Sequence, residues 1–216
     1  PSGDTGHRWV GALVRGVQMT VRSRGPLRIG VFGGPFDPPH IGHLVAAVDA
    51  QQVLGLDVVL LVVAAVPWQK VGERAISPAG ERVAMVRAAV ADRPGLEVSE
   101  LEIRRGGPSY TADTLAELRH AEPEAELFVI LGRDAAAGFT TWERHQEVAD
   151  GATLVVVDRP GPPVALDPAF AWVRVDIPEL EISSTELRDR VASGRSIDYL
   201  TPPAVVTCIT DRGLYR

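Results

Sequence analysis

The sequence predicts an α/β fold, in which helices cover both faces of a doubly wound parallel sheet. Two observations predict it. From residue 26 onward, segments with the pattern of strands alternate with segments that have the spacing of helices. Several of the strand segments are continuous apolar runs, which is typical of strands buried on both faces. With 216 residues, 45% of them hydrophobic, the chain is long enough for one sizeable core.

The first half of the chain contains three predicted strands, over residues 27–33, 58–65 and 96–103. The first two are apolar almost throughout, and the third is taken as a strand as well. A helix follows the first strand, because apolar residues recur there at helical spacing, at Ile41, Leu44, Val45 and Val48. A second helix is predicted over 81–90, where three valines fall on one side.

The second half repeats this alternation. Helices are predicted over 111–120 and, as a short stretch, from Asp134, and strands over 126–131, 152–157 and 172–175. Two C-terminal helices follow, over 184–191 and 204–209. Pro202 and Pro203 at the entry of the last helix and Gly213 past its end are typical helix boundaries.

Composition limits the function and the organisation. The formal net charge of −6 argues against a broad nucleic-acid-binding surface, and no apolar run is long enough to span a membrane. Cys208 is the only cysteine, so neither disulfides nor a cysteine-rich metal site are expected. We expect a soluble cytoplasmic protein with a poorly packed N-terminal extension over 1–25 and a single domain over 26–216.

The most distinctive segment is GVFGGPFDPPHIGH, over residues 30–43. It combines a strand, a glycine turn and a helix that begins with His40 and His43, which share one face of the first turn. The glycines allow close backbone approach, and the helix N-terminus presents free N–H groups and partial positive charge. A phosphate site is therefore predicted. The alternatives are two unlinked surface histidines, or part of a zinc site for which no further ligand is in view.

A second helix start carries the motif ISSTELR, over residues 182–188. Its hydroxyl groups, on Ser183 and Ser184, together with Arg188 one turn later, would form a second anion site suited to a polyphosphate tail. The alternative is an ordinary N-cap in which Glu186 completes a capping box.

Further candidates follow the ends of other predicted strands, where doubly wound sheets bind ligands. Lys70 and Arg159 could bind phosphate there or be solvated surface charges. Tyr110 and Thr111 begin a helix whose N–H groups could capture a carboxylate, or they could be plain capping residues. Trp142 is either a platform for a heteroaromatic ring or a core aromatic.

Together these segments resemble the bacterial nicotinate-mononucleotide adenylyltransferases, over nearly the whole chain after residue 26. The motifs that carry the resemblance are GVFGGPFDPPHIGH, PWQK, GGPSYTADTL, LGRDAAAGFTTW, DRPG and ISSTELR. The first and last mark the wider nucleotidylyltransferase superfamily, and the middle motifs narrow it to the nicotinate branch. The resemblance implies a Rossmann-like nucleotidylyltransferase fold with a small C-terminal helical part.

The resemblance also implies a reaction in NAD biosynthesis. ATP and nicotinate mononucleotide would give deamido-NAD and pyrophosphate, with Mg²⁺ on the polyphosphate and no metal held by the protein. Catalysis would depend on His40, His43 and Arg188. ATP would be bound by Gly33, Gly34, Phe36, His43, Gly132, Asp134, Ile182, Ser183, Ser184 and Arg188. The mononucleotide would be bound by Lys70, Tyr110, Thr111, Asp134, Trp142 and Arg159.

The chain departs from the family pattern in three places. Pro35 stands where the family usually has Thr or Ser, which removes a hydroxyl and a backbone N–H donor from the turn. Gln69 replaces a histidine that many members carry, and the extension over 1–25 is unusually long. Pro35 leaves two alternatives open: an adenylyltransferase for another, modified pyridine mononucleotide, or a non-catalytic nucleotide-binding sensor. Family members often self-associate, so a homo-oligomer is expected as well.

Overall fold

The structure is a computed structural model and describes residues 25–66, 76–158 and 164–216. Within these residues, six strands form one parallel sheet in the order β3-β2-β1-β4-β5-β6. The strands are β1 (Arg28–Gly34), β2 (Val58–Val63), β3 (Leu96–Ser99), β4 (Glu126–Gly132), β5 (Thr153–Asp158) and β6 (Trp172–Asp176). The strand order reverses between β1 and β4, which is the switch point where doubly wound sheets bind ligands. The predicted fold class is confirmed.

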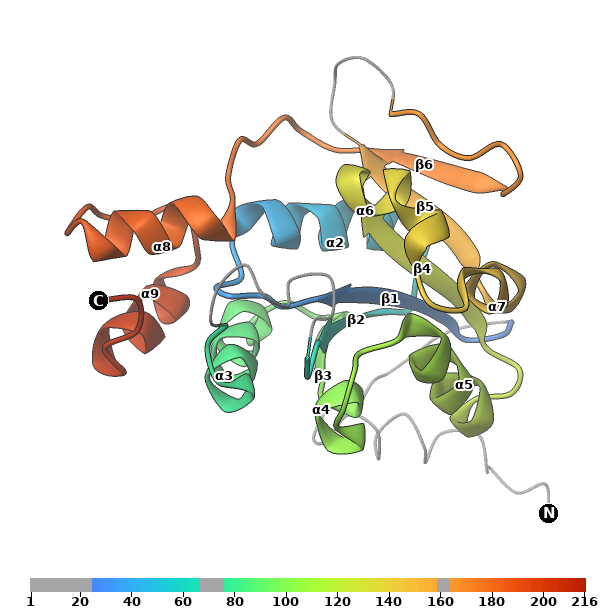
Figure 1. The fold of residues 1–216 in the computed structure, drawn as a ribbon, viewed down its shortest axis with the longest axis horizontal. Coiled ribbons are helices and arrows are strands. Elements are labelled where there is room, and N and C mark those ends of the chain that lie inside the picture. The colour runs from blue at the N-terminus through green and yellow to red at the C-terminus, as the bar shows by residue number, and fades with distance from the viewer. Residues whose placement is uncertain (1–24, 67–75, 159–163) are drawn as a thin grey trace.

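Helices pack on both faces of the sheet (Figure 1). On one face, apolar residues of α2 (Ile41–Leu54) and α3 (Ala79–Val90) join those of the strands in one cluster. The other face is covered by α4 (Leu101–Arg105), α5 (Thr111–Ala121), α6 (Arg133–Ala137), the 3₁₀ turn η2 (Phe139–Thr141) and α7 (His145–Gly151). This two-sided cover explains why β2 is wholly apolar, since all six of its residues are buried.

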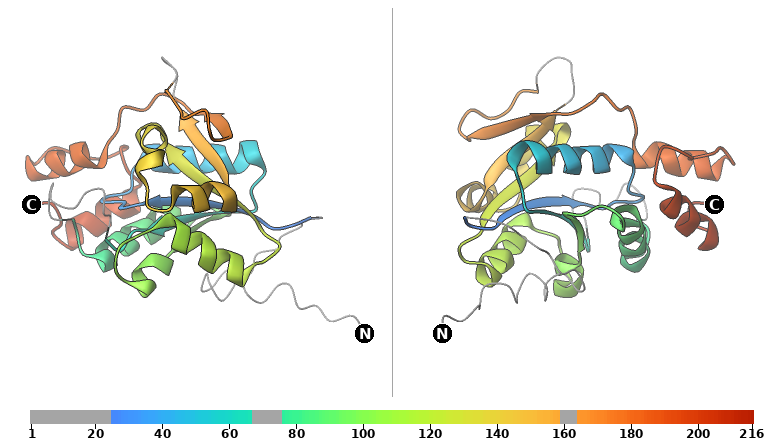
Figure 2. Two further views of the ribbon diagram at one scale, coloured as in Figure 1. Left: turned by 45° about the vertical axis from the view of Figure 1, so that its right-hand side comes forward. Right: turned by 180° about the vertical axis from the view of Figure 1, so that it is seen from behind.

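The last two helices form a small unit at the carboxyl edge of the sheet. They are α8 (Ser184–Ala192) and α9 (Pro203–Asp211), which lie together beyond the N-terminal end of α2 (Figures 1 and 2). Their own small core includes Met85 of α3, Leu187 and Val205. Pro203 takes the first helical position, as predicted. This unit is held against the same edge of the sheet at which β1 ends.

One predicted strand was wrong in its second half. Residues 96–103 were expected to be extended, but β3 ends at Ser99 and α4 follows. The Ser99 hydroxyl accepts the N–H of Leu101 at 3.4 Å as the chain leaves the strand. Leu101 then packs in the apolar cluster on the face opposite α3, so the same apolar residues serve a helix rather than a longer strand. Two elements that were not predicted, η2 and α7, follow α6.

Two further expectations concern features outside the sheet. Residues 1–24 of the predicted N-terminal extension lie outside the described residues. Of the extension over 1–25, the structure describes Gly25. Among the described helices, none is both long and apolar enough to cross a membrane.

Candidate active site

The turn after β1 brings exposed backbone to the carboxyl edge of the sheet. A Cβ on Gly33 would meet no other atom within 4 Å, so the backbone there is open to a ligand. A Cβ on Gly34 would lie 3.3 Å from the ring of Phe36, which is tighter than an ordinary contact. Glycine is therefore needed at position 34 for packing, whereas at position 33 it leaves room for a close approach from outside.

The two predicted histidines lie together at the start of α2. His40 is the N-cap residue and His43 is the third helical residue. Their rings are stacked, with centroids 3.7 Å apart and planes inclined by 29°. The backbone N–H of His40 donates to Nδ1 of His43 at 3.2 Å. Because Nδ1 of His43 is an acceptor, the neutral ring carries its hydrogen on Nε2, which makes Nε2 a donor.

His40 is buried and electrically neutral near pH 7. Its exposed fraction is 7%, and burial lowers its pKa to about 4. Its Nδ1 is buried and has no hydrogen-bond partner in the protein. A buried polar atom without a partner is costly, so a group that supplies a hydrogen bond or a negative charge would be stabilised beside it.

The side chain of Phe36 is buried behind the ring of His43. Its side chain is 1% exposed, and its ring centroid lies 5.1 Å from that of His43, with the planes close to perpendicular. Its backbone φ is 49°, in the left-handed region that disfavours residues with a side chain. The ring therefore supports His43 from behind, and only the backbone of Phe36 could lie along a nucleotide.

The loop between β1 and α2 is held by charged groups beneath it. Arg82 of α3 is 1% exposed and donates from Nη1 to the carbonyl oxygens of Pro35 at 3.0 Å and Ala64 at 2.7 Å. Asp37 is also buried, and its Oδ2 accepts the N–H of Ser77 at 3.2 Å. Neither Arg82 nor Asp37 was singled out from the sequence, although Asp37 lies inside the most distinctive motif.

The second predicted anion site is brought against this loop. The Ser184 hydroxyl donates to the carbonyl oxygen of Pro38 at 2.8 Å, and Nη1 of Arg188 donates to that of Asp37 at 2.7 Å. Ser183 is an N-cap, since its hydroxyl accepts the N–H of Glu186 at 3.1 Å. The capping alternative thus holds for Ser183, while Ser184 and Arg188 connect α8 to the histidine motif.

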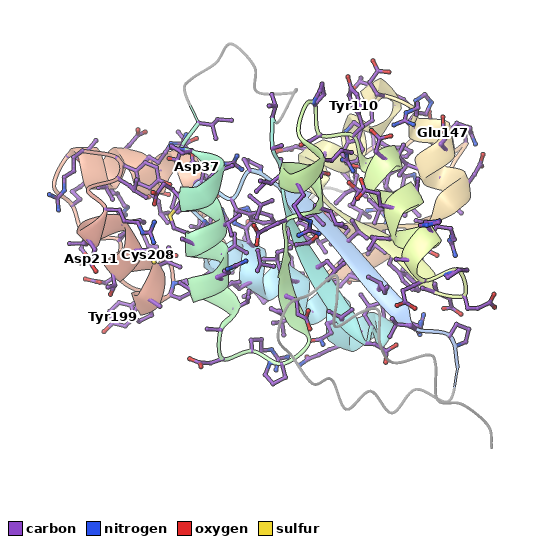
Figure 3. All side chains as sticks on the ribbon, turned by 90° about the horizontal axis from the view of Figure 1, so that it is seen from below. Asp37, Tyr110, Glu147, Tyr199, Cys208 and Asp211 are labelled. Carbon is purple, nitrogen blue, oxygen red and sulfur yellow. The ribbon has the colours of Figure 1, made fainter. Side chains whose placement is uncertain are left out.

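A cavity of about 220 Å³ opens beside the glycine turn. It brings together residues from the ends of β1 and β4, the start of α5 and the segment after η2: Gly33, Gly34, Tyr110, Thr111, Gly132 and Trp142. Figure 3 shows Tyr110 and Asp37 along the same edge of the molecule. Nε1 of Trp142 is buried without a hydrogen-bond partner. The cavity therefore offers an aromatic wall next to the N–H groups at the start of α5.

Of the remaining predicted site residues, Ile182 and Asp134 are described by the structure. Ile182 packs against the C-terminal core, and Asp134 lies in the first turn of α6. Lys70 and Arg159 lie outside the described residues. The structure thus groups most of the predicted residues at one sheet edge.

Sequence reasoning missed several residues of the site. Glu102 lines the cavity and is 6% exposed, and its Oε1 accepts the hydroxyl of Thr114 at 2.9 Å. The Ser109 hydroxyl accepts the N–H of Ala65 at 2.8 Å and so joins the start of α5 to the end of β2. Glu102 could have been noticed only if the segment after Ser99 had been recognised as a helix.

Comparison with known proteins identifies the family. Residues 31–190 match the cytidylyltransferase-like family. A probable nicotinate-nucleotide adenylyltransferase of Thermus thermophilus is 50% identical over 190 residues, covering 88% of this chain and 100% of that protein. A protein of the same description from Saccharopolyspora erythraea is 47% identical, with 88% of this chain and 90% of that protein covered. The chain belongs to the nicotinate-nucleotide adenylyltransferase family.

The same fold occurs in solved structures of more distant proteins. The Plasmodium falciparum nicotinic acid mononucleotide adenylyltransferase complexed with NaAD aligns with a TM-score of 0.73 at 18% identity, covering 88% of this chain and 97% of the other. The same enzyme complexed with APC aligns with a TM-score of 0.70 at 17% identity, covering 88% and 97%. At these identities the likeness shows a shared fold and nothing more.

The side-chain donors around the loop between β1 and α2 suit the stabilisation of negative charge. Among the described residues, no group of three or more His, Cys, Asp and Glu could hold a metal ion. The side chains around the loop include imidazole, hydroxyl and guanidinium groups, from His40, His43, Ser184 and Arg188. Such donors bind phosphate oxygens and stabilise charge that moves from one oxygen to another.

Proposed function

We propose that this chain transfers the adenylyl group of ATP to nicotinate mononucleotide, giving deamido-NAD and pyrophosphate. One observation carries the proposal. The glycine turn belongs both to the histidine motif and to the cavity lined by Tyr110, Thr111 and Trp142. A nucleotide phosphate at the turn and a flat ring in the cavity would therefore be neighbours, as transfer between them requires.

The chemistry needs positioning and charge stabilisation. A phosphate oxygen of the mononucleotide forms a bond to the α-phosphorus of ATP, and the bond from that phosphorus to the bridging oxygen breaks. The bridging oxygen leaves with pyrophosphate and its electron pair. Because the attacking phosphate is already an anion, no strong base is required. The Nε2–H of His43 would donate to the α-phosphate, and Arg188 would pair with the departing phosphates.

His40 and the helix start would complete the phosphate site. The neutral imidazole of His40 has an unpartnered buried nitrogen, which favours either a hydrogen bond to phosphate or uptake of a proton when the anion binds. In the first turn of α2, the N–H of Ile41 donates to the carbonyl oxygen of Leu200 at 3.0 Å and that of His43 to the carbonyl oxygen of His40 at 2.9 Å. This turn would therefore attract a phosphate mainly through the helix dipole. Ser183 and Ser184 would adjoin the ATP tail, with Gly132 and Asp134 near a ribose.

The cavity would bind the pyridine ring. Trp142 offers an aromatic face, and the N–H groups at the start of α5, beside Tyr110 and Thr111, suit a carboxylate. This pairing favours nicotinate over its neutral amide. Lys70 and Arg159 are proposed for the mononucleotide phosphate on the family resemblance alone.

Magnesium would enter the site with ATP. Asp37, the carboxylate within the histidine motif, already accepts hydrogen bonds at both of its oxygens. The ligands of Mg²⁺ would therefore be phosphate oxygens and water, which is the coordination that this ion commonly retains. Bound there, the ion would neutralise charge on the polyphosphate.

Release of pyrophosphate tests the function. Purified protein is incubated with ATP and Mg²⁺ and with either nicotinate mononucleotide or nicotinamide mononucleotide. We expect strong turnover with the first and weak turnover with the second. Turnover with neither, in a protein that still binds ATP, would contradict the proposal and favour a sensor. Comparable or preferred turnover with the amide would instead indicate a different pyridine substrate, consistent with the unusual Pro35.

A further inference from the structure

The side chain of Tyr215 reaches from the last turn of the C-terminal unit into the loop that precedes the histidines. Its hydroxyl donates to Oδ1 of Asp37 at 2.5 Å and lies 3.7 Å from the sulfur of Met85. Burial, and then the bond to Asp37, raise the pKa of Tyr215 well above its usual range, so it remains a donor. Asp37 is itself only 5% exposed.

Asp37 connects three parts of the molecule through different atoms. Oδ1 accepts from Tyr215, Oδ2 accepts the N–H of Ser77, and the backbone oxygen accepts Nη1 of Arg188 at 2.7 Å. Nη2 of Arg188 donates to the hydroxyl of Thr185 at 2.9 Å. The position of the Arg188 guanidinium therefore depends on how the Asp37 peptide is held.

Two tyrosines of the C-terminal unit share an uncommon backbone conformation, and of these two it is Tyr215 that bonds to Asp37. The φ of Tyr215 is 65°, in the left-handed region that residues with a side chain rarely adopt. Tyr199 provides a comparison within the same unit, because its φ is 63° but its side chain is 94% exposed. Figure 3 shows Tyr199 on the outside of the C-terminal helices, away from Asp37.

We propose that Tyr215 is a positioning residue of the ATP site, which acts by holding Asp37 so that Arg188 faces the polyphosphate. The hydroxyl contributes no contact to the substrate. It fixes one carboxylate oxygen, the carboxylate fixes its own peptide, and that peptide oxygen orients the guanidinium. This inference rests on the proposed function for the identity of the ligand, but it concerns ATP alone and not the mononucleotide.

The test is a double-mutant cycle on ATP binding. The dissociation constant of ATP with Mg²⁺ is measured by calorimetry for wild type, Tyr215→Phe, Arg188→Ala and the double variant, without any mononucleotide. Tyr215→Phe keeps the ring and removes only the donor. We expect it to weaken ATP binding about tenfold, as loss of a hydrogen bond to a charged group does. In the Arg188→Ala background the same change should have little further effect.

The matched control is Tyr199→Phe, which should bind ATP as wild type does. A general structural role for Tyr215 would give equal losses in both backgrounds, and this result would overturn the proposal. Unchanged ATP binding in Tyr215→Phe would overturn it as well. Nicotinate mononucleotide affinity, measured alongside, should stay within about twofold, since neither Tyr215 nor Asp37 nor Arg188 lines the cavity.

A second measurement uses the wild-type protein alone, so it does not require that any variant folds. In wild type, hydrogen exchange of the backbone amides in residues 211–216 is followed with and without ATP. If Tyr215 is coupled to the site, ATP should slow exchange in this segment, and no change would count against the proposal. Failure of wild type to release pyrophosphate with any pyridine mononucleotide would refute the proposed function, while ATP binding would still decide the role of Tyr215.

Discussion

At the scale of single residues, the stacked histidines show how one hydrogen bond can orient the side chain that we propose as catalytic. His43 has its Nδ1 occupied by the backbone N–H of His40 and its ring supported by Phe36. Its orientation and its donor atom are therefore set before a substrate arrives. Preorganised donors of this kind cost no rearrangement during the reaction, which is why their removal is expected to reduce the rate.

We predict that His43→Ala lowers kcat by about 10²–10³-fold, comparable to the loss of one preorganised donor to a developing charge. The measurement is steady-state pyrophosphate release with ATP and nicotinate mononucleotide. His120→Ala is the matched control, because His120 is an exposed histidine in the last turn of α5. A loss of less than tenfold in His43→Ala would show that this ring does not contact the transition state.

His40 gives a prediction about pH and stability. Its pKa is lowered from 6.5 to about 4 in the folded protein, so between these values the unfolded chain binds a proton that the folded chain does not. Stability from this residue is therefore complete above pH 6.5 and is lost as the pH falls toward 4. Between pH 7 and pH 5 we expect a loss of about 2 kcal/mol in the free energy of unfolding.

Urea unfolding at the two pH values measures this loss. Other groups also titrate in this range, so the same experiment is carried out on His40→Gln, in which only the contribution of His40 is absent. The difference between the two proteins should shrink at the lower pH. A constant difference across the range would mean that His40 has an ordinary pKa in the folded protein.

At the scale of elements, an ion pair joins the two sides of the cavity. Arg144 follows η2 and Trp142, and its guanidinium pairs with Asp113 in the first turn of α5. Both side chains are more than a third exposed, so solvent screens the pair and it adds little to global stability. Its effect should instead be local, because it connects the segment that carries Trp142 to the helix that begins after Tyr110.

We predict that Arg144→Gln raises KM for nicotinate mononucleotide by about two- to fivefold, a shift expected from a modest loss of preorganisation, with KM for ATP unchanged. The thermal midpoint should barely move. Arg212→Gln serves as the control, since Arg212 forms an exposed ion pair with Glu81 in a different part of the molecule. An equal effect of both variants on KM would argue against a local role for Arg144.

Some helices and strands could be predicted from the sequence more completely than others. The apolar runs of β1, β2 and β4 were recognisable because burial on both faces leaves a continuous signal. The β3–α4 junction was not, since Leu96, Leu101 and the residues between them fit a strand and a helix about equally well over so short a stretch. At this junction tertiary packing determines whether the residues form a strand or a helix, and a local sequence pattern does not contain that information.

The same limit applies to the site. GVFGGPFDPPHIGH and ISSTELR could be singled out as candidate anion sites, because helix starts that carry glycine or hydroxyl residues can bind anions through their backbone N–H groups. The hydrogen bonds from Ser184 to Pro38 and from Tyr215 to Asp37 join residues that are far apart in the sequence. No local sequence pattern indicates such contacts. The general position of the site was therefore predictable, whereas the groups that support it were not.

At the scale of the whole molecule, the fold gathers the proposed site from both ends of the described chain. The strand order places β1 at the centre, and the C-terminal unit returns to the loop after it. Thr201 tethers a third residue of this loop, because its buried hydroxyl donates to the carbonyl oxygen of Pro39 at 2.8 Å. Three consecutive residues of one loop, Asp37, Pro38 and Pro39, are thus each bonded to the C-terminal part.

These three tethers have a consequence for the order in which the molecule folds. They join residues 146, 162 and 178 positions apart, and contacts that close such long loops form late because the chain entropy must be lost first. During refolding from urea, we expect the circular dichroism of the sheet and helices to recover before ATP binding does. Simultaneous recovery would contradict this order. A partly folded chain would then already have most of its secondary structure and still be inert, so that activity would be the last property it acquires.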